Sequence, residues 1–126
     1  LENYKKIASN VEILRKEIIL LLKRLKKQGK TIAAYSAPAK GNILLNYFGI
    51  NKNYLDFIVD KSKAKQGFYT PGTHLLVYPT GKLYLDKPDY LIILCWNIAG
   101  EIIAEFNNYH KNGGKFIIPI PDIKIV

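Results

Sequence analysis

A short segment near the start of the sequence combines residue types that bind anions. It reads Tyr-Ser-Ala-Pro-Ala-Lys-Gly-Asn over Tyr35–Asn42, after an apolar stretch, Thr31–Ala34, and before a helix-like stretch, Ile43–Tyr47. A loop between a strand and a helix presents backbone N–H groups to a phosphate, and Lys40 adds a cation there. The candidate anion-binding residues are Ser36, Ala37, Pro38, Ala39, Lys40, Gly41 and Asn42. A loop that only reverses the chain direction has a similar sequence, because only Gly41 fits the G-x-G-x-x-G dinucleotide fingerprint, and this alternative stays open.

A carboxylate follows the next apolar stretch at a spacing that suits nucleotide binding. Asp60 lies nineteen residues beyond Gly41, where a dinucleotide-binding fold places the carboxylate that accepts hydrogen bonds from ribose hydroxyls. Aspartate also begins many turns by accepting a hydrogen bond from a backbone N–H further along the chain. Asp60 is therefore predicted either to bind a ligand or to cap the turn that follows it.

Residues 61–74 form a long loop with three lysines, two aromatic residues and a Pro-Gly turn. Such a loop can bind a diphosphate and stack against a base, although a solvent-exposed lysine-rich loop has the same composition. Further along, Trp96 and Asn97 offer a stacking plane and a helix N-cap, while packing in the core is the commoner role of a tryptophan. With Asp60, the candidate ligand-binding residues beyond the first loop are Lys65, Gln66, Tyr69, Pro71, Gly72, Thr73, Trp96 and Asn97.

Five short apolar stretches, rich in β-branched and aromatic residues, predict buried strands that would position these side chains. They are Thr31–Tyr35, Leu55–Val59, His74–Tyr78, Tyr90–Leu94 and Lys115–Ile118. They alternate with helix-like segments at Ile43–Tyr47 and Ile98–Lys111, which predicts an α/β, Rossmann-like fold with a five-stranded, mostly parallel sheet and helices on both faces. In such sheets ligands bind beyond the carboxyl ends of the strands, where the strand order reverses, and the candidate residues follow those ends.

A long amphipathic helix is predicted before the first strand. Apolar residues recur at spacings of three and four up to Gly29, namely Ile7, Val11, Leu14, Ile18, Leu21 or Leu22, and Leu25. We therefore divide the chain into a helical connector, residues 1–29, and a Rossmann-like domain, residues 30–126. The helix either packs on its own domain or also contacts a preceding one, and a coiled-coil dimer is less favoured because only about three heptads are present.

The charge and the cysteine and histidine content indicate which kinds of partner and setting the protein has. The net charge of +9 is uneven, because residues 1–30 carry nine basic and three acidic side chains whereas residues 31–126 carry ten and seven. The excess of positive charge therefore belongs to the predicted N-terminal helix, and the sequence has no nucleic-acid-binding pattern. No apolar run is long enough to span a membrane. The single cysteine, Cys95, predicts a reduced, cytoplasmic setting. The two histidines are far apart in the sequence and no cysteine or histidine cluster is present, so no metal site is predicted. The absence of methionine suggests a fragment of a longer protein.

Four segments carry a resemblance to a known family. They are AYSAPAKGNILLNYFGI (Ala34–Ile50), VDKSKAKQGFYTPGTHL (Val59–Leu75), ILCWN (Ile93–Asn97) and GGKFIIPIP (Gly113–Pro121). In this order they resemble the C-terminal domain of the sugar-nucleotide C-methyltransferases, which use S-adenosylmethionine to methylate dTDP-4-keto-deoxysugars. Ser36 stands where similar family members have glycine.

The resemblance implies a three-part enzyme of which this chain is the last part. A zinc-binding domain and an S-adenosylmethionine-binding domain would precede it in the same polypeptide, so both cofactors belong to the full-length enzyme and none to this fragment. The catalytic base belongs to the central domain, so no residue of this chain is assigned as catalytic. The role left is to hold a nucleotide sugar. Two alternatives stay open: a non-enzymatic nucleotide-binding or interaction module, and half of a dinucleotide-dependent oxidoreductase, which Pro38 disfavours because it has no N–H for a pyrophosphate.

Overall fold

A six-stranded sheet forms the centre of the protein. The computed structural model describes residues 2–35, 45–70 and 74–126. The strands are β1 (Ile32–Tyr35), β2 (Phe57–Val59), β3 (Val77–Tyr78), β4 (Tyr90–Ile93), β5 (Lys115–Ile118) and β6 (Lys124–Ile125). The helices are α1 (Glu2–Lys27), α3 (Lys82–Asp86), α4 (Ala99–Glu105) and α5 (Asn107–Lys111), with a 3₁₀ turn, η1 (Trp96–Ile98), and a helical turn at residues 45–48.

The strand order is β3-β2-β1-β4-β5-β6, and the first five strands run parallel. The chain moves outward from β1 to β3 on one side and then returns to place β4 on the other side of β1. The order therefore reverses between β1 and β4, as it does in nucleotide-binding α/β folds. The carboxyl ends of β1, β2 and β4 meet at this switch, which confirms the predicted Rossmann-like arrangement.

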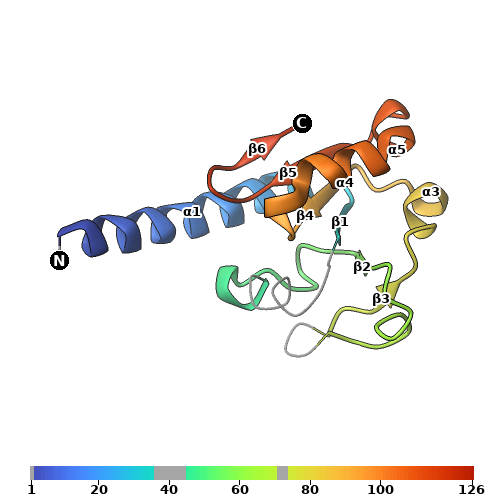
Figure 1. Cartoon of the computed structure of the whole chain (residues 1–126), viewed down its shortest axis with the longest axis horizontal. Coiled ribbons are helices and arrows are strands. Elements are labelled where there is room, and N and C mark those ends of the chain that lie inside the picture. The colour runs from blue at the N-terminus through green and yellow to red at the C-terminus, as the bar shows by residue number, and fades with distance from the viewer. Residues whose placement is uncertain (1, 36–44, 71–73) are drawn as a thin grey trace.

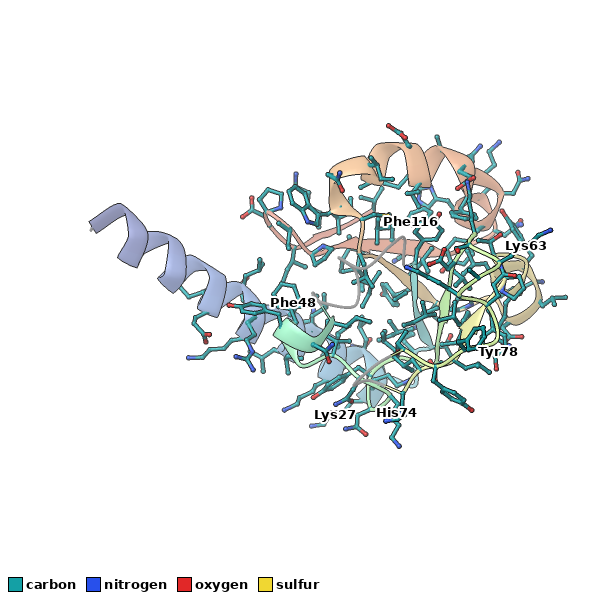
Figure 2. All side chains as sticks on the ribbon, turned by 60° about the horizontal axis from the view of Figure 1, so that its bottom comes forward. Lys27, Phe48, Lys63, His74, Tyr78 and Phe116 are labelled. Carbon is teal, nitrogen blue, oxygen red and sulfur yellow. The ribbon has the colours of Figure 1, made fainter. Side chains whose placement is uncertain are left out.

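Helices cover both faces of the sheet (Figure 1). On one face, alternate strand residues such as Ala34 and Ile58 pack with α1 and with Phe48 of the helical turn. On the other face, their sequence neighbours pack with α3, α4 and α5, and Phe116 is buried there beneath the α4–α5 ribbon (Figure 2). The central strands are buried on both sides, which explains why they read as continuous apolar runs rather than as alternating patterns.

The amphipathic helix is present, and its C-terminal half packs on the sheet. Ile18, Leu21, Leu22 and Leu25 are buried in the core, while the N-terminal half of the ribbon extends away from the sheet (Figure 1). Most basic residues of its second half are exposed, as expected for a solvated face. Lys26 is the exception because its Nζ donates to both carboxylate oxygens of Asp56, at 3.4 and 3.2 Å. No helix of the described residues is long and apolar enough to cross a membrane.

The structure adds elements that the sequence patterns did not predict. The sheet has six strands rather than five, because Lys124–Ile125 pairs with β5 in antiparallel fashion. Helix α3 also forms between β3 and β4. The predicted third strand, His74–Tyr78, is shorter, because only Val77 and Tyr78 pair with β2 and His74 adopts a left-handed conformation with φ 52°.

Candidate functional site

The candidate site lies where β1, β2 and β4 end. The first predicted loop, Ser36, Ala37, Pro38, Ala39, Lys40, Gly41 and Asn42, lies outside the described residues, as do Pro71, Gly72 and Thr73. The described part of the site therefore consists of the segment after β2 and the segment after β4. Its centre is Asp60, whose backbone N–H donates to the carbonyl of Tyr78 at 3.0 Å and extends the pairing of β2 with β3 by one residue.

The carboxylate of Asp60 is buried, and its two oxygens differ. Oδ1 accepts a hydrogen bond from the Ser62 backbone N–H at 2.9 Å, which is the turn cap that the sequence offered as one alternative. Oδ2 has no hydrogen-bond partner among the described residues, although the side chain of Asp60 is only 6% exposed. Oδ2 forms an ion pair with Nζ of Lys65 at 3.9 Å, and that lysine side chain is 40% exposed. Among the described residues, Oδ2 therefore has an ion pair with Lys65 but no hydrogen bond.

Gln66 also stabilises this turn through two hydrogen bonds. Its Nε2 donates to the Asp60 carbonyl at 2.8 Å, and its own backbone N–H donates to the Ser62 carbonyl at 3.3 Å. Residues 60–66 therefore form a compact turn in which Asp60, Lys65 and Gln66 lie together. The structure brings these three predicted residues together, and Gln66 has a clear structural role there.

A tyrosine at the end of β1 belongs to the same neighbourhood. Burial raises the pKa of Tyr35 to about 12, and the nearby Glu105, Cys95 and Asp60 add to the rise. Burial also raises the pKa of Cys95, with a further contribution from Asp60. Both groups therefore carry their protons at neutral pH and are hydrogen-bond donors rather than anions. Lys61 forms an ion pair with Glu105 of α4, which joins the turn after β2 to the helix after β4.

The rest of the loop after β2 folds back on itself. The Gly67 N–H donates to the Val77 carbonyl at 2.8 Å, and Tyr69 forms an antiparallel bridge with Leu76. Tyr69 and Phe68 nevertheless remain 64% and 67% exposed. Two large aromatic side chains on a backbone that is held by hydrogen bonds are available for contact with another molecule.

The segment after β4 differs from its prediction. Trp96 is 42% exposed, so core packing, the commoner role of a tryptophan, does not describe it. The prediction that Asn97 caps a helix is wrong, because Asn97 lies inside η1 and the N-cap positions of η1 and α4 are Cys95 and Ile98. Within the described chain, no hydrogen bond or ion pair joins Tyr69, Trp96 or Asn97 to Asp60.

The sequence did not single out Tyr35, Glu105 or Lys61 as parts of the site. Tyr35 could have been found, because the last residue of a central parallel strand faces the ligand-binding edge. Glu105 could not, since its position depends on how α4 packs across the sheet.

A hollow of about 420 Å³ lies at the opposite, amino-terminal edge of the sheet. Its only cation, Lys82, is already engaged, because Nζ lies 2.7 Å from an Asp86 oxygen and 4.2 Å from the centre of the Tyr78 ring. The hydrogen bond to Asp86 raises the pKa of Lys82. This hollow therefore offers a ligand no free charge. No group of three or more metal-binding side chains gathers among the residues whose positions are described.

Comparison with known proteins identifies the family. A family model described as the C-methyltransferase C-terminal domain matches residues 1–121. The chain belongs to this family. The C-methyltransferase NovU of Streptomyces niveus is 35% identical to it over 123 residues, which are 98% of this chain and 29% of that protein. The chain thus spans less than a third of the length of this curated relative.

A solved structure shares the fold at lower sequence similarity. The UDP-D-quinovosamine 4-dehydrogenase of Vibrio fischeri superposes with a TM-score of 0.51 at 15% identity, over 77% of this chain and 93% of that one. At this identity the likeness concerns the fold alone. As a C-methyltransferase C-terminal domain, the chain thus has a Rossmann-like sheet, and the buried carboxylate of Asp60 lies at the switch-point edge of that sheet.

Proposed function

We propose that this chain is the substrate-holding domain of an S-adenosylmethionine-dependent C-methyltransferase that acts on a nucleotide-linked keto-deoxysugar. The observation that supports this role is the gathering of Asp60, Lys65 and Gln66 at the switch-point edge of the sheet. In the full-length enzyme, S-adenosylmethionine supplies the methyl group, and preceding domains of the polypeptide hold it and a zinc ion. The cytoplasmic location expected from the single cysteine is part of the same proposal.

The residues of this chain bind and orient. Lys65 is exposed enough to meet a diphosphate and lies close enough to Asp60 to be held near the edge of the sheet. Tyr69 and Phe68 present exposed rings that suit stacking on a base or a sugar. The predicted anion-binding loop, with Lys40, directly follows β1 in the sequence. A substrate held here would present its keto sugar to the preceding domain, which carries the catalytic base.

Calorimetric titration of the isolated chain tests the proposal. Thymidine diphosphate and a thymidine-diphosphate sugar should bind and raise the thermal midpoint, whereas NAD should not, because a ligand stabilises the folded state that binds it. S-adenosylmethionine should give no heat. Micromolar binding of S-adenosylmethionine, or the absence of any nucleotide binding, contradicts the proposal.

A matched pair of lysine variants locates the binding. Lys65→Ala should weaken thymidine diphosphate binding about tenfold or more, since a contact with a charged group is worth about 1.5–3 kcal/mol. Lys111→Ala removes an equally basic, exposed side chain from the end of α5, just before β5 begins, and should leave the affinity unchanged. Equal effects of the two changes would indicate general charge attraction rather than a site.

A further inference from the structure

A smaller hollow lies at the amino-terminal edge of the sheet, where the chain enters β4 and β5. Its volume is about 270 Å³, and its lining comes from the ends of α3 and α5 and from the segments that follow them. Ligand pockets for drug-sized molecules measure about 300–1,000 Å³, so this hollow suits a molecule the size of one amino acid and is too small for a nucleotide sugar. It lies at the edge opposite to Asp60, so the candidate nucleotide site does not include it.

An apolar surface forms the inner part of the hollow. Leu83 and Tyr109, which both line it, are 0% and 3% exposed. The Tyr109 hydroxyl donates to the Pro88 carbonyl at 2.7 Å, which fixes the ring. Tyr84 also lines the hollow and is 41% exposed, so it belongs to the outer part of the lining. An apolar side chain of a ligand can therefore pack on surfaces that are already in place.

Two groups of opposite charge line the same hollow, and the fold neutralises neither completely. The Lys87 side chain has no hydrogen bond or ion pair within the described part of the chain. Asp89 uses one carboxylate oxygen, because Oδ2 accepts hydrogen bonds from the N–H and the hydroxyl of Thr31 at 2.8 and 3.1 Å. Its Oδ1 has no such partner among the described residues. Lys87 and Asp89 form no ion pair with each other there, so each can meet a group of the opposite charge on a ligand.

The backbone at position 87 does not call for a lysine. Lys87 has φ 48° and ψ 61°, a left-handed conformation that glycine adopts without strain and that a side chain disfavours. The next residue is Pro88, which pushes the residue before it toward extended conformations. A residue that only ended α3 here would be glycine or asparagine. The lysine therefore stands at this position at a local cost, as strained residues at functional sites do.

We propose that this hollow binds a free amino acid with an apolar side chain. Lys87 pairs with the carboxylate of the amino acid, Asp89 accepts a hydrogen bond from its ammonium group, and its side chain packs against Tyr109. A zwitterion suits the hollow better than a simple acid or amine, because either of those would leave one of the two opposite charges without a partner. The inference is independent of the proposed function, since it concerns the other edge of the sheet and a different class of ligand.

NMR titration of the ¹⁵N-labelled chain tests the inference with four probes. L-Leucine carries both charges and an apolar side chain. L-Leucinamide lacks the carboxylate, N-acetyl-L-leucine lacks the ammonium group, and glycine lacks the apolar side chain. The backbone amides of Gly113 and Gly114, which line the hollow, report on binding there. The original protein should bind L-leucine about tenfold more tightly than each of the other probes, because each of them lacks one of the three contacts.

Two variants assign the charges. In Lys87→Gly, the preference for L-leucine over L-leucinamide should fall to about twofold or less, since the partner of the carboxylate is gone. The thermal midpoint of this ligand-free variant should stay the same or rise, because glycine adopts the left-handed conformation without strain. In Asp89→Asn, which keeps an oxygen for the Thr31 donors, the preference over N-acetyl-L-leucine should fall in the same way. Lys16→Ala removes an exposed lysine from α1 and is the control, which should keep every preference.

Three results would overturn the inference. The first is an original protein in which L-leucine, up to its solubility limit, shifts the amide signal of neither Gly113 nor Gly114. The second is equal binding of L-leucine, L-leucinamide and N-acetyl-L-leucine, which would make the hollow an apolar pocket without charge recognition. The third is a Lys87→Gly protein with a lower thermal midpoint and an unchanged preference, which would make Lys87 structural only. A failure of the original protein to bind any nucleotide is a separate result, since it removes the proposed function and leaves this inference in place.

Discussion

Gly114→Ala should destabilise the protein strongly, because the glycine lies directly under a fixed aromatic ring. A Cβ at position 114 would lie 2.2 Å from Cζ of Tyr109 and 2.4 Å from Cε2. The ring has little freedom to move away. Tyr109 is 3% exposed, its hydroxyl donates to the Pro88 carbonyl at 2.7 Å, and its ring centre lies 5.7 Å from that of Phe116.

The size of the effect follows from these contacts. Forcing a methyl group into a packed core costs about 1–3 kcal/mol through shifted side chains. If the ring moves enough to break the bond to Pro88, a buried carbonyl is left unpaired at a further cost of about 1–3 kcal/mol. The expected loss is therefore about 2–6 kcal/mol of the free energy of unfolding, a large share of the ~5–15 kcal/mol that domains possess.

Urea unfolding followed by circular dichroism measures this loss. Gly100→Ala in α4 is the matched control, because a Cβ there meets no atom within 4 Å. That change should stabilise the protein by about 0.5–1 kcal/mol, as alanine does relative to glycine within helices. Removing the ring, with Tyr109→Ala in the Gly114→Ala background, should lower the free energy of unfolding by less than the sum of the losses caused by the two single changes. A Gly114→Ala protein within about 0.5 kcal/mol of the original would refute the reasoning, since surface-like changes fall in that range.

Three further predictions concern the site. Tyr35 has a pKa of about 12 in the folded protein, while an unfolded tyrosine titrates near 10, so its contribution to stability is complete below about pH 10 and is lost as the pH rises through 12. Urea unfolding at pH 8 and 11 should show a smaller alkaline loss for Tyr35→Phe, by about 1 kcal/mol after allowance for solvent screening, and an identical loss would contradict this. Cys95 should react with iodoacetamide at pH 8 more slowly than a free thiol, because its pKa is raised, and Asp60→Asn should speed the reaction; an unchanged rate would mean that Asp60 does not act on the thiol. Lys40→Ala should weaken binding of a thymidine-diphosphate sugar by about 10–150-fold, the equivalent of about 1.5–3 kcal/mol, and an unaltered calorimetric affinity would exclude Lys40 from the site.

The central strands could be predicted because burial on both faces leaves a simple signature. Tyr90–Ile93 and Lys115–Ile118 are short apolar runs with polar or turn residues on either side, and both form strands. The strand Lys124–Ile125 carries no such signature, since both of its residues are exposed and its backbone pairs only with β5. An edge strand of two residues depends on where its partner lies, and that information is not local.

The candidate site was predictable where it depends on one continuous segment. Asp60, Lys65 and Gln66 lie together because a single turn after β2 contains all three. The segment after β4 was harder, since its residue types suggested a capped helix and the backbone forms a 3₁₀ turn first. That turn places Asn97 inside η1 and leaves Ile98, which has no capping side chain, at the start of α4. Residue type thus predicted that a helix begins here but not which residue occupies its N-cap.

Asp60 shows why a structural and a functional interpretation of one residue need not exclude each other. The sequence offered a turn cap and a ligand contact as alternatives; the structure confirms the cap through Oδ1, and the ligand contact stays a prediction. Oδ1 is used by the Ser62 N–H, so the cap accounts for an aspartate or an asparagine equally well. Oδ2 is buried, has no hydrogen bond within the described residues, and lies 3.9 Å from the ammonium of Lys65, which is too far for a hydrogen bond. The ion pair with Lys65 gives the charged form some advantage over the amide, so the structure explains the carboxylate in part by the turn and in part by this lysine.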